Sequence, residues 1–302
     1  ERFLEALLSG ESREQAILIV HDAPAVRTFP RQGPLPWQPD FVVRLAEGFR
    51  PGKHPLYEKG ALYPLDLSSA FAASAMLAIR TPVRRVLDLC AAPGGKAIFA
   101  WRAFHPEHLV ANETMRKRTG SLIANLERCR IEGSAVGSAD PSVWARKAPE
   151  AFDLVVVDAP CSGQSLLAKG DPAPGCFDPE MIDMCVGRQR RIISHAATSV
   201  APGGHLLYAT CTYALKENEK VLAWLLAQRE DLEAVEVPSH AAYRSPHADF
   251  PCYRLYPHSG EGAGAFAALL RKRGETPALP ELEGLPLFWR YGVPGKGVDL
   301  DS

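Results

Sequence analysis

The sequence predicts an α/β fold built around a mostly parallel, doubly wound sheet. Between residues 83 and 230, short apolar runs alternate with helix-like stretches, the pattern of repeated strand–helix units. Two of the apolar runs, 83–88 and 152–158, end on an aspartate. The first leads through Gly94 and Gly95 into a predicted helix, and such a turn presents backbone N–H groups to a ligand.

The composition is that of a globular protein. The chain has 302 residues, 46% hydrophobic and 23% charged, enough for a large core and an appendage. It contains no apolar run that would span a bilayer and does not open on a secretory signal. Residue 1 is Glu rather than Met, so we expect the native N-terminus to be missing or processed. The formal net charge is −1, so a nucleic acid would have to bind to local basic patches.

The seven cysteines form no CxxC pair and lie at positions 90, 129, 161, 176, 185, 211 and 252. Their odd number and scattered spacing favour reduced thiols in a cytosol over disulfides or a zinc site. His21, His54 and His195 have no carboxylate or thiol at ligand spacing, so no metal site is predicted. We therefore expect a cytoplasmic monomer that needs neither a metal nor a membrane.

Residues 1–60 are predicted to form a small accessory region. A short helix is expected at 3–8 and a short strand at 16–20, and six prolines between 30 and 55 break any longer element. Cations and aromatics are interleaved here: Arg27, Arg31, Arg44, Arg50, Lys53, His54 and Lys59 with Trp37, Phe41, Phe49 and Tyr57. The mixture suits unpaired RNA, because bases stack on rings while cations contact phosphates. Solvated charges on a satellite domain explain it equally well.

Residues 61–273 are predicted to form the main domain. It begins with a turn and an alanine-rich helix over 61–79, capped by Ser68 or Ser69 and ended by Thr81-Pro82. Further helices are expected at 97–104, 114–130, 180–200 and 217–229. Strands are expected at 83–88, 109–111, 135–139, 152–158, 205–209, 232–237 and 263–270. A long polar loop precedes Asp178, and such loops are often functional. Residues 274–302 are expected to lie as an extended tail.

Acidic and thiol side chains follow the predicted strands. Ligands of open parallel sheets bind at the carboxyl ends of the strands. The residues expected there are Asp88, Glu113, Asp140, Asp158 and Cys211. Glu113 follows the glycine turn by roughly 20 positions, the spacing at which an acidic residue usually holds a ribose hydroxyl.

Three segments resemble the signature set of a known family: Asp88-Leu89-Cys90-Ala91-Ala92-Pro93-Gly94-Gly95-Lys96, Asp158-Ala159-Pro160-Cys161-Ser162-Gly163 and Thr210-Cys211-Thr212. In order and spacing they resemble the Nol1/Nop2/Sun family of S-adenosylmethionine-dependent RNA cytosine-5 methyltransferases. With Pro202-Gly203-Gly204 and Glu217-Asn218-Glu219, the resemblance covers approximately residues 60–270. It implies a Rossmann-like methyltransferase fold with S-adenosyl-L-methionine as cofactor.

The resemblance also implies the residues that bind the cofactor. Its methionine part would lie in the turn formed by Cys90, Ala91, Ala92, Pro93, Gly94, Gly95 and Lys96. Glu113 would bind the ribose hydroxyls, Arg118 would add a contact on the cofactor side, and Asp140 would meet the adenine. Asp158 would lie between the cofactor and the target cytosine.

The catalytic roles implied by the resemblance fall on Cys211, Cys161, Asp158 and Lys96. Cys211 would be the nucleophile and Cys161 the cysteine that helps to release the product. A thiolate added to C6 of cytosine gives C5 the carbanion character that it needs to accept a methyl group. Asp158 would stabilise the charge on the ring, and Lys96 would support Asp158 or polarise the base. A base near Cys161, or its own thiolate, would take the C5 proton.

Plainer explanations stay open for some residues. The thiols of Cys90, Cys129, Cys176, Cys185 and Cys252 are expected to be core side chains. Asp140 would also serve as a helix cap, and Lys96 as a solvated helix residue. Two stretches depart from the family pattern, residues 63–69 and 262–266. Neither contains a cysteine, and both concern the positioning of the substrate.

Other functions fit these residues less well. A methyltransferase for exocyclic amines needs a proline where Cys161 stands, and a P-loop needs other residues at Cys90 and Ala97. A DNA enzyme would attack with Cys161 and lack Cys211. A non-catalytic RNA-binding or assembly factor on a methyltransferase scaffold remains the alternative. We expect an RNA cytosine-5 methyltransferase that acts on an unstacked cytosine of rRNA or tRNA.

Overall fold

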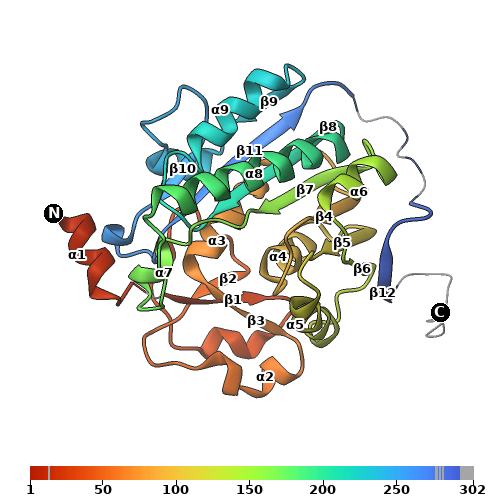
Figure 1. The fold of residues 1–302 in the computed structure, drawn as a ribbon. Coiled ribbons are helices and arrows are strands. Elements are labelled where there is room, and N and C mark those ends of the chain that lie inside the picture. The colour runs from red at the N-terminus through yellow and green to blue at the C-terminus, as the bar shows by residue number, and fades with distance from the viewer. Residues whose placement is uncertain (13, 276–277, 279, 281, 293–302) are drawn as a thin grey trace.

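The computed structural model describes residues 1–12, 14–275, 278, 280 and 282–292. At its centre lies a nine-stranded sheet in the order β10-β11-β8-β7-β4-β5-β6-β12, with β9 paired to β11 (Figure 1). Its parallel strands are β4 (Arg85–Asp88), β5 (His108–Asn112), β6 (Ser134–Gly137), β7 (Phe152–Asp158) and β8 (Val200–Thr210). The sequence predicted all five, and the doubly wound α/β fold is confirmed.

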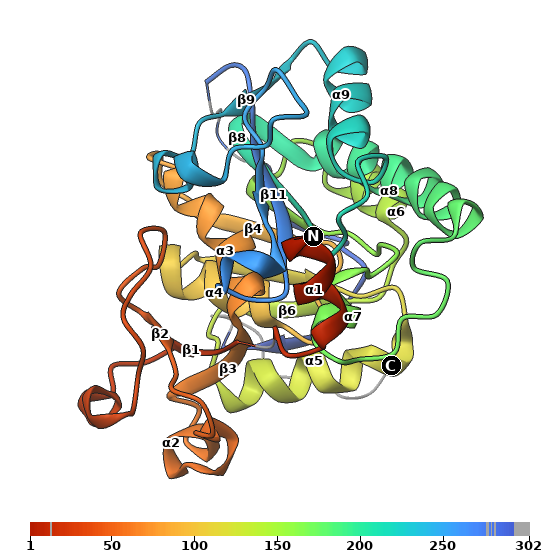
Figure 2. The same cartoon turned by 90° about the vertical axis from the view of Figure 1, so that its left-hand side faces the viewer.

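Helices cover both faces of this sheet (Figures 1 and 2). One face carries α3 (Leu67–Ser74), α4 (Gly95–Phe104) and α5 (Arg116–Arg128), and the other carries α6 (Pro141–Lys147), α8 (Pro179–Ser199) and α9 (Glu219–Gln228). Successive strand residues point to opposite faces: Val86 packs into the first core and Leu87 into the second. These strands therefore read as continuous apolar runs.

The parallel strands reverse their order between β4 and β7. From β4 the chain adds β5 and β6 on one side, then crosses to add β7 and β8 on the other. In open α/β sheets the ligand crevice lies outside the carboxyl ends of the strands at such a switch point. Asp88 ends β4 and Asp158 ends β7, so the topology places both at the crevice.

The N-terminal region forms a second, three-stranded antiparallel sheet. Its strands are β1 (Gln15–Ile19), β2 (Val42–Arg44) and β3 (Leu62–Asp66), in the order β2-β1-β3. Helix α1 (Arg2–Ser9) precedes it, and the short α2 (Pro55–Glu58) lies before β3. The predicted boundary at residue 60 falls just before the third strand of this sheet. Figure 2 shows the sheet at one side of the main body.

Two local predictions about residues 61–79 are wrong. The expected turn is strand β3, which pairs with β1, so a partner distant in sequence determines its conformation. The cap of α3 is neither Ser68 nor Ser69 but Asp66, whose side chain accepts a hydrogen bond from the Ser68 N–H (3.0 Å). Ser68 is buried, and its Oγ accepts from the Gly264 N–H instead (3.1 Å). Helix α3 ends at Ser74, and a 3-10 turn follows.

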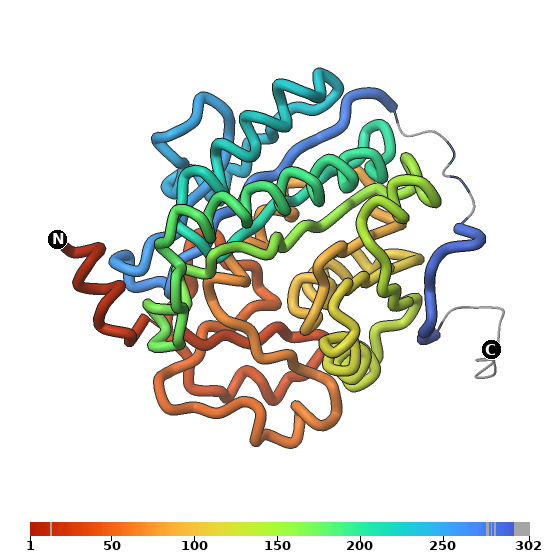
Figure 3. Tube along the Cα trace, in the orientation of Figure 1, coloured from red at the N-terminus to blue at the C-terminus, as the bar shows by residue number. Residues whose placement is uncertain are grey.

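The last strands are antiparallel additions to the sheet. They are β9 (Leu232–Val235), β10 (Tyr253–Leu255), β11 (Ala265–Lys272) and β12 (Leu287–Tyr291). Strand β12 lies in the predicted tail and pairs with β6, at the opposite edge from β10 (Figure 3). Other parts of the tail lie outside the described residues.

The long loop after β7 contains a single helical turn, α7 (Ser165–Ala168). Within the described chain, no helix combines the length and apolarity needed to cross a membrane.

Candidate active site

The glycine turn between β4 and α4 is shaped by its own backbone. The Cys90 N–H donates to Asp88 Oδ1 (3.2 Å), and the Gly94 N–H donates to the Ala91 carbonyl (2.7 Å). Gly94 has a φ of 119°, outside the range that a side chain tolerates. It precedes Gly95, the first residue of α4, so the N-terminal N–H groups of the helix face the end of β4.

Side chains of α5 hold the outer side of this turn. Arg118 donates to the Ala92 carbonyl and forms an ion pair with Glu113 (3.1 Å). Asn125 donates to the Pro93 carbonyl (2.9 Å). Glu113 is buried just after β5, and its second oxygen accepts from the Met115 N–H (2.8 Å). The structure therefore brings Glu113 and Arg118 to the turn, as predicted, and adds Asn125, which no local pattern in the sequence indicated.

The turn suits a cationic cofactor such as S-adenosylmethionine. Asp88 is fully buried, and its Oδ2 has no hydrogen-bond partner in the described part of the chain. Burial, reinforced by the nearby Asp158, raises the pKa of Asp88 to about 7. A buried carboxyl group with an unsatisfied oxygen would be stabilised by a cationic ligand. Asp88, the N–H groups of the turn and Glu113 are thus the residues that would hold the cofactor.

Asn112 and Asp140 lie near the carboxyl ends of β5 and β6. Asn112, at the end of β5, is buried and donates to the carbonyls of Leu89 (3.2 Å) and Ala139 (3.0 Å), which joins the ends of three strands. Asp140 caps α6 by accepting from the Ser142 N–H (2.9 Å), and hydrogen bonds from Ser142 lower its pKa. Asp140 is therefore a helix cap, the plainer of its two explanations, and its contact with adenine stays a prediction.

Lys96 and Asp158 form a close ion pair across the switch point. Lys96 Nζ lies 2.7 Å from Asp158 Oδ2, and the lysine side chain is only 8% exposed. The alternative of a solvated Lys96 is wrong, because its side chain is buried and its ammonium group is paired with Asp158. Burial alone would lower the pKa of Lys96, but the charge of Asp158 and its hydrogen bond raise it. The ammonium group is therefore retained, and it fixes the Asp158 carboxylate.

The two predicted active-site cysteines lie against each other. Cys161 follows β7 and Cys211 follows β8, two parallel neighbours, and their Sγ atoms are 3.3 Å apart. A hydrogen bond from the Cys161 thiol lowers the pKa of Cys211, against the effect of burial. The same contact, together with burial, raises the pKa of Cys161 well above its ordinary value. Cys211 is thus the thiol that more readily becomes a thiolate, the form that reacts.

A buried carboxylate joins the two cysteine loops. Glu217 is fully buried and accepts from the Ser162 N–H (2.9 Å), from the Ser162 hydroxyl and from Thr212 Oγ1 (3.2 Å). Gln189 of α8 donates to the same carboxylate (2.8 Å) and to the Pro160 carbonyl (3.1 Å). Ser162 follows Cys161, and Thr212 follows Cys211. Glu217 therefore fixes the positions of the two cysteine loops relative to each other through hydrogen bonds to its carboxylate.

Four of the remaining cysteines are core residues, as predicted: Cys129, Cys176, Cys185 and Cys252 are buried. Cys90 is half-buried, because it lies in the glycine turn and only packs against the core. Searched over the described residues, the structure shows no group of three or more His, Cys, Asp or Glu side chains arranged to hold a metal ion.

Residues 75–271 match the family described as 16S rRNA methyltransferase RsmB/F. The chain belongs to the RsmB/F family. All three signature segments lie inside the matched range, so the predicted family relationship is confirmed. Methyltransferases of this family use S-adenosylmethionine, the cofactor predicted from the sequence.

Relatives of this RsmB/F chain include proteins named ribosomal RNA small subunit methyltransferase F. The protein of Pectobacterium carotovorum is 34% identical, over 82% of this chain and 52% of its own length. The protein of Escherichia coli strain HS is 33% identical, over 82% of this chain and 53% of its own length. The chain spans about half the length of the curated relatives that it matches.

Two archaeal structures share the fold. A methyltransferase homolog protein from Pyrococcus horikoshii has a TM-score of 0.73 at 23% identity and covers 90% of both chains. NSun6 from the same organism, solved with SFG, has a TM-score of 0.67 at 18% identity and covers 91% of this chain and 94% of its own. At these identities the likeness shows the fold alone.

In the RsmB/F chain most predicted site residues fall into two groups. The first, at the ends of β4 and β5, consists of the turn from Cys90 to Gly95 with Glu113 and Arg118. The second, near the ends of β4, β7 and β8, consists of Lys96, Asp158, Cys161 and Cys211. Asp140 belongs to neither group and lies where α6 begins. The sequence reasoning assigned no role to Asn112, Asn125, Gln189 and Glu217, although the Glu217-Asn218-Glu219 segment was part of the family resemblance.

Proposed function

We propose that this chain is an RNA cytosine-5 methyltransferase whose substrate is ribosomal RNA, and that Cys211 bonds covalently to C6 of the target cytosine. The cysteine pair carries the proposal. Two thiols 3.3 Å apart have pKa values shifted in opposite directions, so one is suited to attack and the other retains its proton. The pair also lies at the carboxyl ends of two neighbouring parallel strands, where open α/β sheets bind their ligands.

The residues present account for each step. The Cys211 thiolate adds to C6, and the electron pair of the 5,6 double bond moves to C5. Asp158, held by Lys96, accepts a hydrogen bond from the exocyclic amine of the cytosine and orients the base, and the Lys96 ammonium group offsets the negative charge that develops on the ring. S-adenosylmethionine, when bound, supplies the electrophilic methyl group that C5 accepts.

Release of the product restores the cysteines. A base beside Cys161 removes the C5 proton, and the electron pair left on C5 reforms the 5,6 double bond. The C6–S bond breaks at the same time, and Cys211 leaves as a thiolate. Cys161 is the nearest thiol to this leaving sulfur and returns as its hydrogen-bond donor.

The names of the relatives favour ribosomal RNA over transfer RNA, the two substrates that the sequence left open. A ribosomal substrate agrees with the predicted cytoplasmic location. In this proposal residues 1–60 form an RNA-binding accessory region, residues 61–273 the catalytic domain, and the molecule acts as a monomer. The Cys90–Lys96 turn, Glu113, Arg118 and Asp140 bind the cofactor.

The proposal is tested by trapping the covalent intermediate. Purified protein, S-adenosylmethionine and unmodified 16S rRNA are mixed, and protein–RNA adducts are separated on a denaturing gel. Cys161→Ala is expected to accumulate the adduct, because release is blocked. Cys211→Ala is expected to form none and to lose methyl transfer on the order of 10⁴-fold or more. Cys129→Ala, which removes a buried thiol outside the site, is the matched control and should behave as wild type.

Other outcomes would refute the assignment. An adduct that depends on Cys161 instead of Cys211 would exchange the two roles. Wild-type protein that binds S-adenosylmethionine but neither methylates 16S rRNA nor forms an adduct would point to the non-catalytic alternative or to transfer RNA. Repeating the assay with transfer RNA separates those two cases.

A further inference from the structure

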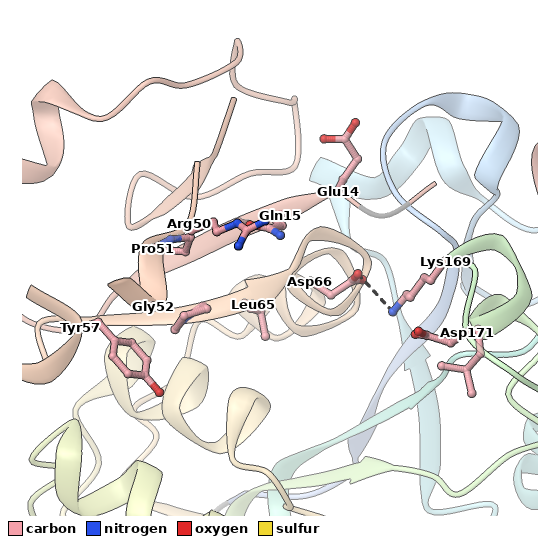
Figure 4. A pocket seen from close by; sticks show the side chains of 13 residues that line it. Glu14, Gln15, Arg50, Pro51, Gly52, Tyr57, Leu65, Asp66, Lys169 and Asp171 are labelled. Atoms are coloured by element: carbon pink, nitrogen blue, oxygen red, sulfur yellow. Dashed lines mark ion pairs between the residues drawn. The ribbon is translucent and has the colours of Figure 1, made fainter. Parts of the chain in front are cut away.

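A pocket of about 710 Å³ lies between the N-terminal sheet and α7 (Figure 4). Its volume lies within the range of about 300–1,000 Å³ that is usual for small-molecule sites. One wall comes from β1, β3 and the segment around Arg50, and the other comes from Leu166, Lys169 and Asp171. It contains neither the cysteine pair nor Lys96 and Asp158, so the target base would lie elsewhere.

Both walls of the pocket are attached to the candidate active site. On one side, Leu65 packs against the glycine turn so closely that a Cβ added to Gly95 would lie 2.9 Å from Leu65 Cδ1. On the other side, the Ser165 N–H donates to the Cys211 carbonyl (3.0 Å), and Leu166 follows in the pocket wall. The pocket therefore lies next to both the glycine turn and the loop that carries Cys211.

The pocket has a cationic end and a paired acidic end. In Figure 4, Arg50 lies beside Gln15 at one end, and Asp66, Lys169 and Asp171 lie at the other. Lys169 forms an ion pair with Asp66 (3.2 Å), so the charge of Asp66 is balanced. Lys169 is also among the cations that lower the pKa of Cys211, which places this end within electrostatic reach of the nucleophile.

Arg50 differs from Arg31 and Arg44, two other arginines of its basic stretch. Arg44 forms an ion pair with Glu14 (3.3 Å), and Arg31 donates to the Val26 carbonyl (2.6 Å). Across the described residues, Arg50 has no ion pair and no side-chain hydrogen bond, and it is exposed at the pocket. A guanidinium group in this state is well suited to bind a phosphate.

The rest of the lining suits a base. Tyr57 and Leu65 supply ring and aliphatic surface, and the Arg128 guanidinium lies 3.8 Å from the centre of the Tyr57 ring. The Asp66 and Lys169 pair supplies hydrogen-bond acceptors and donors at the far end. Unpaired RNA is recognised in this way, with the base against apolar or aromatic surface, polar groups at the base edge and cations at the phosphate.

We propose that this pocket binds the nucleotide next to the target cytosine, with its phosphate on Arg50 and its base toward Lys169 and Asp66. The assignment rests on the proposed function and adds to it a second nucleotide subsite on the N-terminal sheet. Binding here would hold the strand on both sides of the flipped base. It would also make the N-terminal sheet part of the recognition of the RNA sequence.

The test compares Arg50→Ala, Arg50→Lys and Lys53→Ala with wild type. Lys53 is the matched control, because it is an exposed cation three residues away that does not line the pocket. A short labelled single-stranded RNA with one cytosine is titrated by fluorescence anisotropy at several salt concentrations. Arg50→Ala is expected to weaken binding roughly tenfold, the effect of one charged hydrogen bond. It should also reduce the slope of log Kd against log salt by about 0.7, the loss of one phosphate contact.

Parallel measurements separate this proposal from the function itself. Arg50→Ala should raise the KM of methyl transfer to 16S rRNA and leave the Kd for S-adenosylmethionine unchanged. Arg50→Lys should retain the salt slope. If wild type methylates 16S rRNA and Arg50→Ala behaves like Lys53→Ala, the pocket assignment is wrong and the function stands. If wild type binds S-adenosylmethionine but methylates no RNA, the proposed function fails, and the pocket assignment fails with it.

Discussion

The two sides of the candidate site are held in different ways. On the cofactor side, the end of a strand, a glycine turn and the start of a helix follow one another in the nine residues from Asp88 to Lys96, and the turn is shaped by short-range hydrogen bonds and the conformation of Gly94. On the cysteine side, two loops fifty residues apart meet, and the buried Glu217 carboxylate holds them together. The first side is local in sequence, and the second is assembled from distant parts.

This difference predicts different sensitivities to mutation. A turn of this kind depends most on the glycine that permits its conformation. Loops held by one carboxylate depend on that group, because its removal leaves several buried donors without a partner. The following predictions test whether the two sides fail independently.

The largest effect is expected for Glu217. In wild type, hydrogen-bond donors face the Glu217 carboxylate, and Glu217→Gln would present an amide N–H₂ to some of them. The two cysteine loops would then no longer be held in their relative positions. We expect adduct formation to fall by about 100-fold, a loss of about 3 kcal/mol. The Kd for S-adenosylmethionine should stay within about twofold of wild type, since the other side of the site is intact.

A neighbouring carboxylate controls for lost stability. Glu219 is also buried, but it pairs with Arg254 instead of the cysteine loops. Glu219→Gln should lower the melting temperature and keep the rate of adduct formation per folded molecule. Equal losses of adduct in both variants would show that Glu217 acts only through stability.

A smaller effect, on cofactor binding instead of adduct formation, is expected for Gly94. Gly94→Ala places a Cβ at a φ of 119°, and such strain costs about 1–3 kcal/mol. Relief of that strain would distort the turn, so the Kd for S-adenosylmethionine, measured by calorimetry, should rise about tenfold. The alkylation rate of Cys211 should not change.

Gly120 of α5 is the control for this variant. A Cβ there would have no neighbour within 4 Å. Gly120→Ala should therefore leave cofactor binding intact and raise the free energy of unfolding by roughly 0.5–1 kcal/mol. If Gly94→Ala binds the cofactor as well as Gly120→Ala does, the turn is not the cofactor site.

The smallest effect concerns pH. The Cys161 hydrogen bond lowers the pKa of Cys211, so alkylation of Cys211 by iodoacetamide should rise with pH and reach its midpoint at a lower pH than for an ordinary cysteine. Cys161→Ala removes the hydrogen bond that lowers this pKa, so the midpoint should move to higher pH. The alkylation rate at pH 7 should therefore fall. Mass spectrometry of the Cys211 peptide gives the rate, and an unchanged midpoint would contradict the proposed hydrogen-bond effect.

The features that could be predicted from the sequence are the locally encoded ones. The apolar runs indicated the five parallel strands, and the Asp88–Lys96 and cysteine segments indicated the candidate catalytic groups. It failed where a distant partner decides the outcome. Strand β3 exists because it pairs with β1, and Ser68 is unavailable as a cap because it meets Gly264. The roles of Glu217 and Asn112 depend on which loops and strand ends the fold brings to them, and no spacing in the sequence expresses this.

The pairing of β12 with β6 has a consequence for molecules in contact with one another. Without β12, the N–H and C=O groups along the outer side of β6 would be open to a strand of a neighbouring molecule, a common start of aggregation. Strand β12 occupies that side and leaves only five residues as the new border, among them the exposed Arg290. A short border that carries a charge is a poor template for further strands. Strand β12 thus shields this edge of the sheet from pairing with other molecules.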